Sequence, residues 1–204
     1  MLPITSKYKI AKRLGAQIFE KTQSQKFALS EARTTKKPKR GGRGGGSDYG
    51  RQLLEKQKVR FTYSITEGKL ASYAEKAYVE KNPAEALHRM LERRLDSVAY
   101  RAGFARTRRG ARQMTSHGHI LVNGVRVMVP SYETKKGDII TVREGSRSSA
   151  LFSHLGDPET AAWPVPNWLA VDNGLMKIEV TGLPPYTPSD VPLDYAAVFE
   201  FYSR

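Results

Sequence analysis

Residues 93–143 hold two secondary-structure patterns in succession, and together these patterns limit the folds open to the chain. The first pattern is helical, because apolar side chains recur at intervals of three and four residues and form one stripe. This stripe consists of Leu95, Val98, Ala99 and Ala102. Gly103 follows where a glycine commonly ends a helix in the left-handed conformation. The stretch is therefore predicted to begin with one amphipathic helix.

A second helix and a β-hairpin are predicted to follow. Thr107 is a suitable N-cap for a helix that runs to about His117. Asn123 and Gly124 stand between two apolar runs, which is the strongest short signal of a hairpin. The segment DIITVR, at 138–143, alternates in polarity and predicts one more strand. We therefore expect a small module of two helices and a β-hairpin.

The same stretch is strongly basic, with eleven Arg and Lys residues against three acids, a difference of +8. Arg94 and Arg101 lie seven residues apart on one predicted helical face, and Arg108 and Arg112 lie four apart on the next. For a single helix, a solvated basic face would explain this pattern equally well. Two successive helices of the same sign instead favour phosphate binding, because folding does not require charges that repel one another.

The whole chain is basic, and its charge is unevenly distributed. Its 204 residues include 34 Lys and Arg against 20 Asp and Glu, and its pI is about 10.0. Residues 1–60 have 16 basic and 4 acidic side chains, a net +12, whereas residues 144–204 have 3 and 8, a net −5. This balance argues against an ordinary metabolic enzyme and predicts a polyanionic partner.

The first 46 residues are predicted to form a basic extension. Ile10, Leu14 and Ile18 recur every four residues and predict a short amphipathic helix over 7–21. Residues 34–46, TTKKPKRGGRGGG, have low complexity and no face that could pack. A plain linker is one interpretation, and a flexible tail that orders on RNA is the other. The candidate RNA-binding residues of this tail are Lys36, Lys37, Lys39, Arg40 and Arg43.

Further helices are predicted between the extension and the basic module. One begins at Ser47 or Asp48, and another covers roughly 66–80. The best helix start in the chain is Asn82-Pro83, which supplies an N-cap and a proline at the first helical position. Its apolar stripe continues into that of the basic module, so we expect one unbroken helix there.

Residues after 144 are predicted to form loops and short strands. Trp168 and Leu169 are interpreted as a packing anchor, with stacking on a base as the alternative. The segments LMKIEV, at 175–180, and AAVFEFYS, at 196–203, are both predicted to be strands.

Several classes of protein are disfavoured by what the sequence lacks. It contains no cysteine, so disulfides and thiolate metal sites are impossible. Its four histidines lack metal-ligand spacing, apart from the pair His117 and His119, so no metal or other cofactor is expected. It has no run of 18 apolar residues and no uninterrupted apolar core near the N-terminus, so neither a membrane span nor secretion is expected.

The motifs of the basic module resemble a known family. Arg94-Leu95-Asp96, the run from Thr107 to Gly124 and the run from Gly137 to Val142 resemble the RNA-binding domain named after the fourth protein of the bacterial small ribosomal subunit. SDYGRQLLEKQKVR at 47–60, NWLAVD at 167–172 and the terminal VFEFYSR are similar to signatures of that ribosomal protein family itself. The resemblance covers about 47–204 well and the first 46 residues loosely.

The resemblance implies a fold class and a domain organisation. The expected class is α+β, a mostly helical domain with an inserted RNA-binding module of two helices and a β-hairpin, preceded by a flexible basic N-terminal extension. The expected domains are the extension, 1–46; the helical domain, 47–92, completed by 163–204; and the RNA-binding domain with a trailing loop, 93–162. Gly110 departs from the family, which often has Glu there, and should cost the second helix about 1 kcal/mol.

The resemblance also implies a function without catalysis. The expected role is a structural constituent of the small ribosomal subunit, bound to the five-helix junction in the 5′ domain of its RNA and nucleating assembly. Contact with ribosomal protein five, near the place where mRNA enters, would support translational accuracy. Other small-subunit proteins and mRNA are further expected partners, and a membrane is not. The expected location is the cytoplasmic ribosome, with an organellar ribosome left open.

The predicted RNA-binding residues come from the basic module and from the helix predicted after Ser47. No catalytic residue is predicted. In the helix they are Tyr49, Gln52, Lys56, Lys58 and Arg60. In the module they are Arg93, Arg94, Arg101, Arg106, Thr107, Arg108, Arg109, Arg112, Ser116, His117, His119 and Asn123.

Two other functions are alternatives to a structural RNA-binding protein. An RNA-modifying or aminoacylating enzyme could use such a module for docking, but neither flank carries a phosphate-binding loop or a nucleophile elbow. Asp96 and Asp138 are better explained by capping and turn roles than by catalysis. A basic adaptor that binds an acidic protein surface is the third hypothesis, and it predicts binding that added RNA does not affect.

Overall fold

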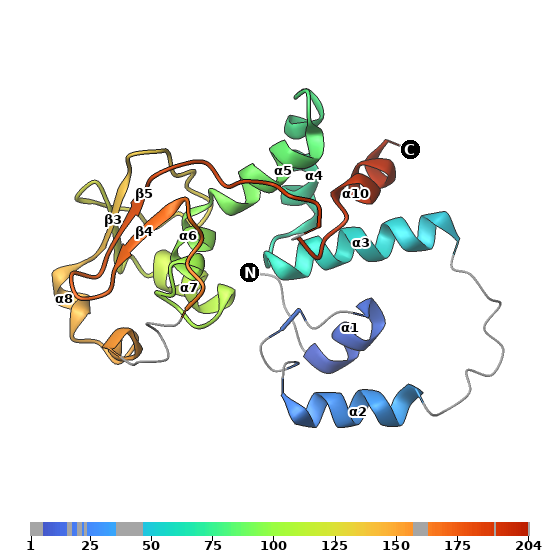
Figure 1. The fold of residues 1–204 in the computed structure, drawn as a ribbon, viewed down its shortest axis with the longest axis horizontal. Helices are drawn as coiled ribbons and strands as arrows, with labels where there is room; N and C mark the ends of the chain where they lie inside the picture. The colour runs from blue at the N-terminus through green and yellow to red at the C-terminus, as the bar shows by residue number, and fades with distance from the viewer. Residues whose placement is uncertain are drawn as a thin grey trace. The chain divides into compact units, whose positions relative to one another are not determined.

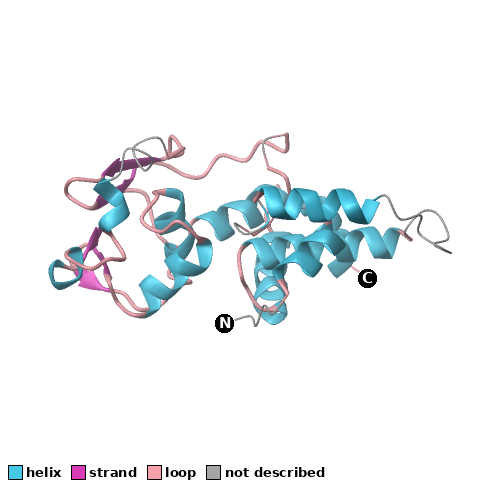
Figure 2. Ribbon diagram, turned by 90° about the horizontal axis from the view of Figure 1, so that it is seen from below, coloured by secondary structure: helices cyan, strands magenta, loops and turns pink. Residues whose placement is uncertain are grey.

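The computed structural model describes residues 6–15, 18–19, 22, 24–35, 47–156, 163–189 and 191–203 (Figure 1). The chain folds into two compact units: unit 1 comprises Met1–Ala84 and Thr187–Arg204, and unit 2 comprises Glu85–Tyr186. The fold is α+β and mostly helical, as predicted, and the described strands, magenta in Figure 2, all belong to unit 2. Among the described residues, no helix is both long and apolar enough to cross a membrane.

The described residues of unit 1 form helices and the turns between them. The Ser47 hydroxyl accepts a hydrogen bond of 3.2 Å from the backbone N–H of Gly50, and so caps the longest helix. The first helix is shorter than the predicted range 7–21, because Gly15 adopts a left-handed φ of 64° and ends it. The described helices of unit 1 are α1 (Lys7–Leu14), α2 (Gln25–Thr35), α3 (Asp48–Thr62), α4 (Glu67–Tyr78) and α10 (Tyr195–Tyr202).

The strand predicted at 196–203 is wrong, because these residues form α10. Asp194 caps this helix by accepting a hydrogen bond of 3.1 Å from the N–H of Ala197. The helix packs mainly on α3 and also on α4, and it buries Tyr195, Ala197 and Val198. A short apolar run has the same periodicity in a buried helix and in a buried strand, and here the contact with α3 decides between them.

Unit 2 contains the predicted pair of helices and the predicted hairpin. Asn123 and Gly124 have φ values of 50° and 79°, the left-handed pair that a two-residue hairpin turn requires. The two helices, α6 and α7, pack on each other. The described elements of unit 2 are most of α5 (Pro83–Glu92), then α6 (Leu95–Arg101), α7 (Arg108–Ser116), β1 (Ile120–Val122), β2 (Val125–Arg126), β3 (Ile139–Val142), α8 (Glu144–Arg147), η2 (Ser153–Gly156), β4 (Leu169–Asp172) and β5 (Lys177–Val180).

The strands form one antiparallel sheet in the order β2-β1-β3-β5-β4. β5 pairs with β3, with Ile140 opposite Ile178, and β4 pairs with β5 at the edge. Residues 163–186 were expected to complete the helical domain. In the structure they belong to unit 2, and only Thr187–Arg204 cluster with unit 1. This difference follows from the backbone pairing of β5 with β3, a long-range contact that local patterns do not contain.

The core of unit 2 lies between its helices and this sheet. Leu95, Val98, Ile120 and Ile140 are completely buried in it. Trp168 is 6% exposed and belongs to the same core, so the predicted packing anchor is confirmed.

The unbroken helix predicted across residues 83–102 is wrong. α5 ends at Glu92, and Arg94 has an extended backbone with φ −65° and ψ 138° before α6 begins. Two backbone hydrogen bonds to a distant segment stabilise the chain at this break. Leu95 N–H donates to the Tyr132 carbonyl at 2.8 Å, and Thr134 N–H donates to the Arg93 carbonyl at 2.9 Å. The apolar stripe continues through the break, which is why periodicity did not reveal it.

Candidate nucleic-acid interface

Two buried carboxylates hold the arginines of α6 and α7 in place. The first is Glu92, the last residue of α5, whose side chain is 2% exposed. It accepts two hydrogen bonds from Arg101, from Nε at 2.8 Å and from Nη2 at 2.9 Å. It also accepts one from Nη2 of Arg108 at 3.1 Å. Glu92 therefore neutralises charge on two arginines that come from two different helices.

The second carboxylate is Asp96, in the first turn of α6. It accepts hydrogen bonds from Nε of Arg94 at 2.9 Å and from Nη2 of Arg94 at 2.6 Å. Nη1 of Arg112, on α7, donates to the same carboxylate at 3.4 Å. The six side chains that form these ion pairs, here called the Glu92–Asp96 network, are Glu92, Asp96, Arg94, Arg101, Arg108 and Arg112.

This network corrects the premise that folding does not require the module's charge. The side chains of Arg94 and Arg108 are only 2% and 14% exposed, and each compensates a buried acid. Arg108 also lies over the ring of Tyr100, 4.7 Å from its centroid. Asp96, expected to have a capping role, is instead an ion-pair partner. Arg101 and Arg112 keep 40% and 26% of their side chains exposed, so part of the predicted basic face does reach the surface.

A second group of basic residues, two histidines and two arginines, lies at the end of α7. The ring centroids of His117 and His119 are 6.1 Å apart, and His119 Nδ1 is 2.9 Å from Ser146 Oγ. Burial lowers the pKa of His119, and the neighbouring charges of His117, Arg143 and Arg126 lower it further. Arg126 and Arg143 are exposed, and neither was predicted as a site residue. Arg126 lies in β2 and Arg143 directly follows β3, so neither belongs to a helical pattern that could have indicated it.

Several predicted RNA-binding residues have local structural partners. Thr107 caps α7 by accepting a hydrogen bond of 2.9 Å from Gly110 N–H, and the Ser116 hydroxyl donates to the Arg112 carbonyl within the helix. The amide of Asn123 donates to Asp138 at 3.0 Å and accepts from Ile139 N–H at 2.9 Å. Asp138 also accepts from the N–H of Lys135, so its predicted turn role is confirmed.

The remaining predicted residues of the module are Arg93, Arg106 and Arg109. Arg93 is partly buried, with Nη1 2.9 Å from the Glu133 carboxylate and Nε 2.9 Å from the Thr134 carbonyl. Arg106 is exposed in the turn before α7, and Arg109 is half-buried in its first turn. The module therefore brings exposed or partly exposed cations together around α7, while Arg94 lies inside it.

The predicted residues of α3 are divided between the surface and the interior of unit 1. Tyr49 is exposed, and Lys58 and Arg60 are partly buried beside Glu55 and Glu67 respectively. Gln52 is buried and donates to Glu200 at 2.9 Å, and Lys56 is only 5% exposed. The tail residues Lys36, Lys37, Lys39, Arg40 and Arg43 lie outside the described part of the chain.

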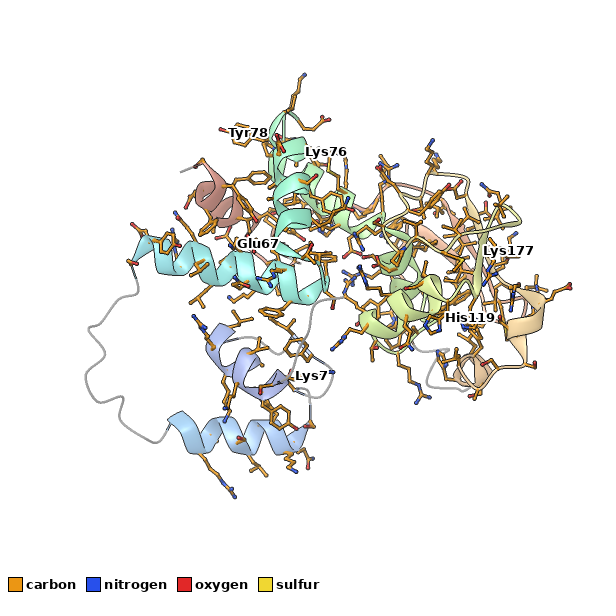
Figure 3. All side chains as sticks on the ribbon, turned by 180° about the vertical axis from the view of Figure 1, so that it is seen from behind. Lys7, Glu67, Lys76, Tyr78, His119 and Lys177 are labelled. Carbon is orange, nitrogen blue, oxygen red and sulfur yellow. The ribbon has the colours of Figure 1, made fainter. Side chains whose placement is uncertain are left out.

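Lys56 belongs to a polar cluster inside unit 1. Its ammonium group lies 2.7 Å from Oε1 of Glu67 and 4.0 Å from the ring centroid of Phe201. Glu67, labelled in Figure 3 at the start of α4, also accepts a hydrogen bond of 2.8 Å from the Tyr202 hydroxyl. Burial alone would raise the pKa of Glu67, but the hydrogen bonds from Lys56 and Tyr202 outweigh it, and the net pKa is lowered. Burial and Glu67 both raise the pKa of Tyr202.

Comparison with known proteins identifies the class first. Residues 93–140, which contain the helix pair, the hairpin and 8 of the 18 arginines of the chain, match the model of the S4 domain. Residues 4–93 match the model of the ribosomal protein S4/S9 N-terminal domain. The chain is thus an S4-domain protein with a second matching domain before it.

Relatives with 40–48% identity show which family of S4-domain proteins the chain belongs to. The chain is 48% identical over 159 residues to small ribosomal subunit protein uS4 of Mycobacterium avium, covering 78% of this chain and 79% of that protein. It is 40% identical over 203 residues to uS4 of a Sulfurihydrogenibium species, covering 96% and 95%. It is 44% identical over 159 residues to uS4 of Lachnospira eligens, covering 78% and 80%. The chain belongs to the family of small ribosomal subunit protein uS4.

Proposed function

We propose that the protein is a structural constituent of the small ribosomal subunit that binds its ribosomal RNA and has no catalytic role. The observation that carries this proposal is the group of arginines around α7, from Arg106 before the helix to Arg112 within it, in an S4 domain. Exposed arginines from different elements can contact several phosphates at once and fix the orientation of the protein on the RNA.

The finer parts of the proposal concern the RNA target and the protein neighbours. The target is the five-helix junction in the 5′ domain, which the protein binds early and so nucleates assembly. Contact with ribosomal protein five, near the path of the incoming mRNA, supports translational accuracy, and the protein acts on the ribosome in the cytoplasm. Helical side chains cannot read the narrow major groove of RNA, so recognition depends on junction shape and on phosphate and 2′-hydroxyl contacts.

Filter binding to small-subunit RNA fragments over a salt series tests the proposal. Transfer RNA and an RNA with a scrambled junction serve as competitors. If about 8 phosphates are neutralised, the slope of log affinity against log salt lies near −6 to −7, at 0.7 to 0.9 for each phosphate. Equal binding to every RNA, or a slope shallower than about −2, would contradict it.

Two variants distinguish binding at the surface around α7 from a general attraction between a basic protein and RNA. Arg106→Ala combined with Arg143→Ala removes two exposed cations and should weaken binding about 10- to 100-fold, because each phosphate contact by a charged donor contributes roughly 1 kcal/mol or more. Lys76→Ala removes one exposed cation from α4 in unit 1 and should leave affinity nearly unchanged. Equal losses per charge removed would mean that the α7 surface is not the binding site.

A further inference from the structure

Glu92 joins two arginines that approach it from different helices. Its carboxylate is almost fully buried, yet Arg101, which it binds at two points, keeps 40% of its side chain exposed. Asp96 has the same relationship with Arg112, whose side chain is 26% exposed. In both cases the acid is buried and the arginine that binds it keeps part of its side chain exposed.

We propose that Glu92 and Asp96 are positioning residues for RNA binding, which fix the guanidinium groups of Arg101, Arg108 and Arg112 before the RNA arrives. This inference rests on the proposed function. A guanidinium has five N–H donors in a rigid plane, and the carboxylates occupy some of them and set the direction of the plane. An arginine that is already oriented loses less side-chain entropy when it binds a phosphate.

The two carboxylates should also repel RNA. The direction in which affinity changes when one of them is replaced therefore tests the inference. Each is a negative charge within the surface that is meant to attract a polyanion. If only total charge mattered, replacing either acid by its amide would raise the net charge by one and tighten binding. If the acids position the arginines, the same replacement weakens binding although the protein becomes more basic.

The experiment compares Glu92→Gln and Asp96→Asn with Glu179→Gln in the full chain, using the junction RNA fragment. Glu179, on β5, has a side chain 48% exposed and lies 3.9 Å from Lys177, so its replacement makes the same charge change outside the network. We expect Glu92→Gln and Asp96→Asn to weaken binding about tenfold, the loss of roughly one charge-assisted contact. Glu179→Gln should bind as tightly as the wild type or slightly more tightly. Binding by Glu92→Gln as tight as by Glu179→Gln would overturn the proposal.

A further variant separates positioning from folding. Glu92→Asp keeps the charge and shortens the side chain by one methylene, so it should bind less tightly than the wild type while circular dichroism shows a folded protein. A folded Glu92→Asp variant with wild-type affinity would overturn the proposal. So would failure of both Glu92 variants to fold at the binding temperature, because Glu92 would then be a folding residue only.

A double-mutant cycle tests whether Glu92 affects RNA binding through the arginines that it binds. Glu92 should act through the arginines that it holds, so Glu92→Gln should weaken binding clearly less in an Arg101→Ala background than in the wild type. Fully additive losses would contradict positioning. If the wild type itself shows no preference for the junction RNA, the proposed function fails, and that outcome is distinct from any difference among the variants.

Discussion

The guanidinium of Arg94 forms a two-point ion pair with the carboxylate of Asp96, two residues further along the chain. Nε lies 2.9 Å from Oδ1 and Nη2 lies 2.6 Å from Oδ2, and the two residues are 1% and 5% exposed. Arg94 also stands at the break between α5 and α6, where it forms a β-bridge with Glu133. Its charge therefore stabilises the interior of unit 2.

Replacing Arg94 with Ala should destabilise the protein by about 3–5 kcal/mol, because the buried Asp96 loses its closest cation. Urea unfolding followed by circular dichroism measures this change. Arg143→Ala removes an exposed arginine of the same unit and should stay within about 0.5 kcal/mol of the wild type. Equal stability of the two variants would show that the ion pair of Arg94 and Asp96 contributes little to folding.

The Lys56–Glu67–Tyr202 cluster should make unit 1 sensitive to acid. The pKa of Glu67 in the folded protein lies below its usual 4.5, so its contribution to stability is fully present above that pH and is lost as the pH falls through the lowered value. When the pH is lowered from about 6 to about 3, the melting temperature should therefore fall less steeply for Glu67→Gln than for the wild type. Parallel curves would contradict the role of Glu67.

RNA affinity should rise as the pH falls, through His119. Its pKa in the free protein is lowered by burial and by His117, Arg143 and Arg126, so the ring is mostly neutral at neutral pH. A phosphate beside it favours the protonated ring, and binding then takes up a proton. Affinity measured between about pH 7.5 and 5.5 should increase for the wild type and increase less for His119→Gln. Equal pH dependence would place His119 away from the RNA.

Unit 2 should need β4 and β5 in order to fold. A fragment of residues 85–186 should melt cooperatively, whereas residues 93–162 should not, because they lack Glu92 and leave β3 without its partner β5. Within the full chain, Ile178→Ala should cost about 2–5 kcal/mol, since Ile178 is completely buried in the core of unit 2. Cooperative melting of the shorter fragment would support the domain boundary expected from the sequence instead.

Local patterns predicted the elements whose cause is local. The hairpin at Asn123 and Gly124 and the cap at Thr107 depend on turn and cap chemistry within a few residues, and both are present. The prediction that Trp168 packs in the interior is also confirmed, because its side chain is buried.

The elements that sequence reasoning missed depend on contacts between distant residues. The break before Leu95 is held by the segment around Tyr132, and the apolar run at 196–203 became a helix because it packs on α3. The same limit applies to the site. Charge patterning indicated Arg101 and Arg112, which are partly exposed, as candidate site residues. It could not show that Arg94 and Lys56 are buried beside acids, because the position of a residue in the sequence does not reveal a partner from another element.

The packing of α10 on α3 also has a consequence for the order of events during synthesis. Unit 2 is one continuous segment, so a nascent chain can complete it once about residue 186 is available. Unit 1 must wait, because the face of α3 that α10 covers stays open until residues 195–202 have left the exit tunnel. Unit 1, whose synthesis begins first, is thus the unit that finishes folding last. A chain that stops before Tyr195 would have a complete unit 2 and an incomplete unit 1.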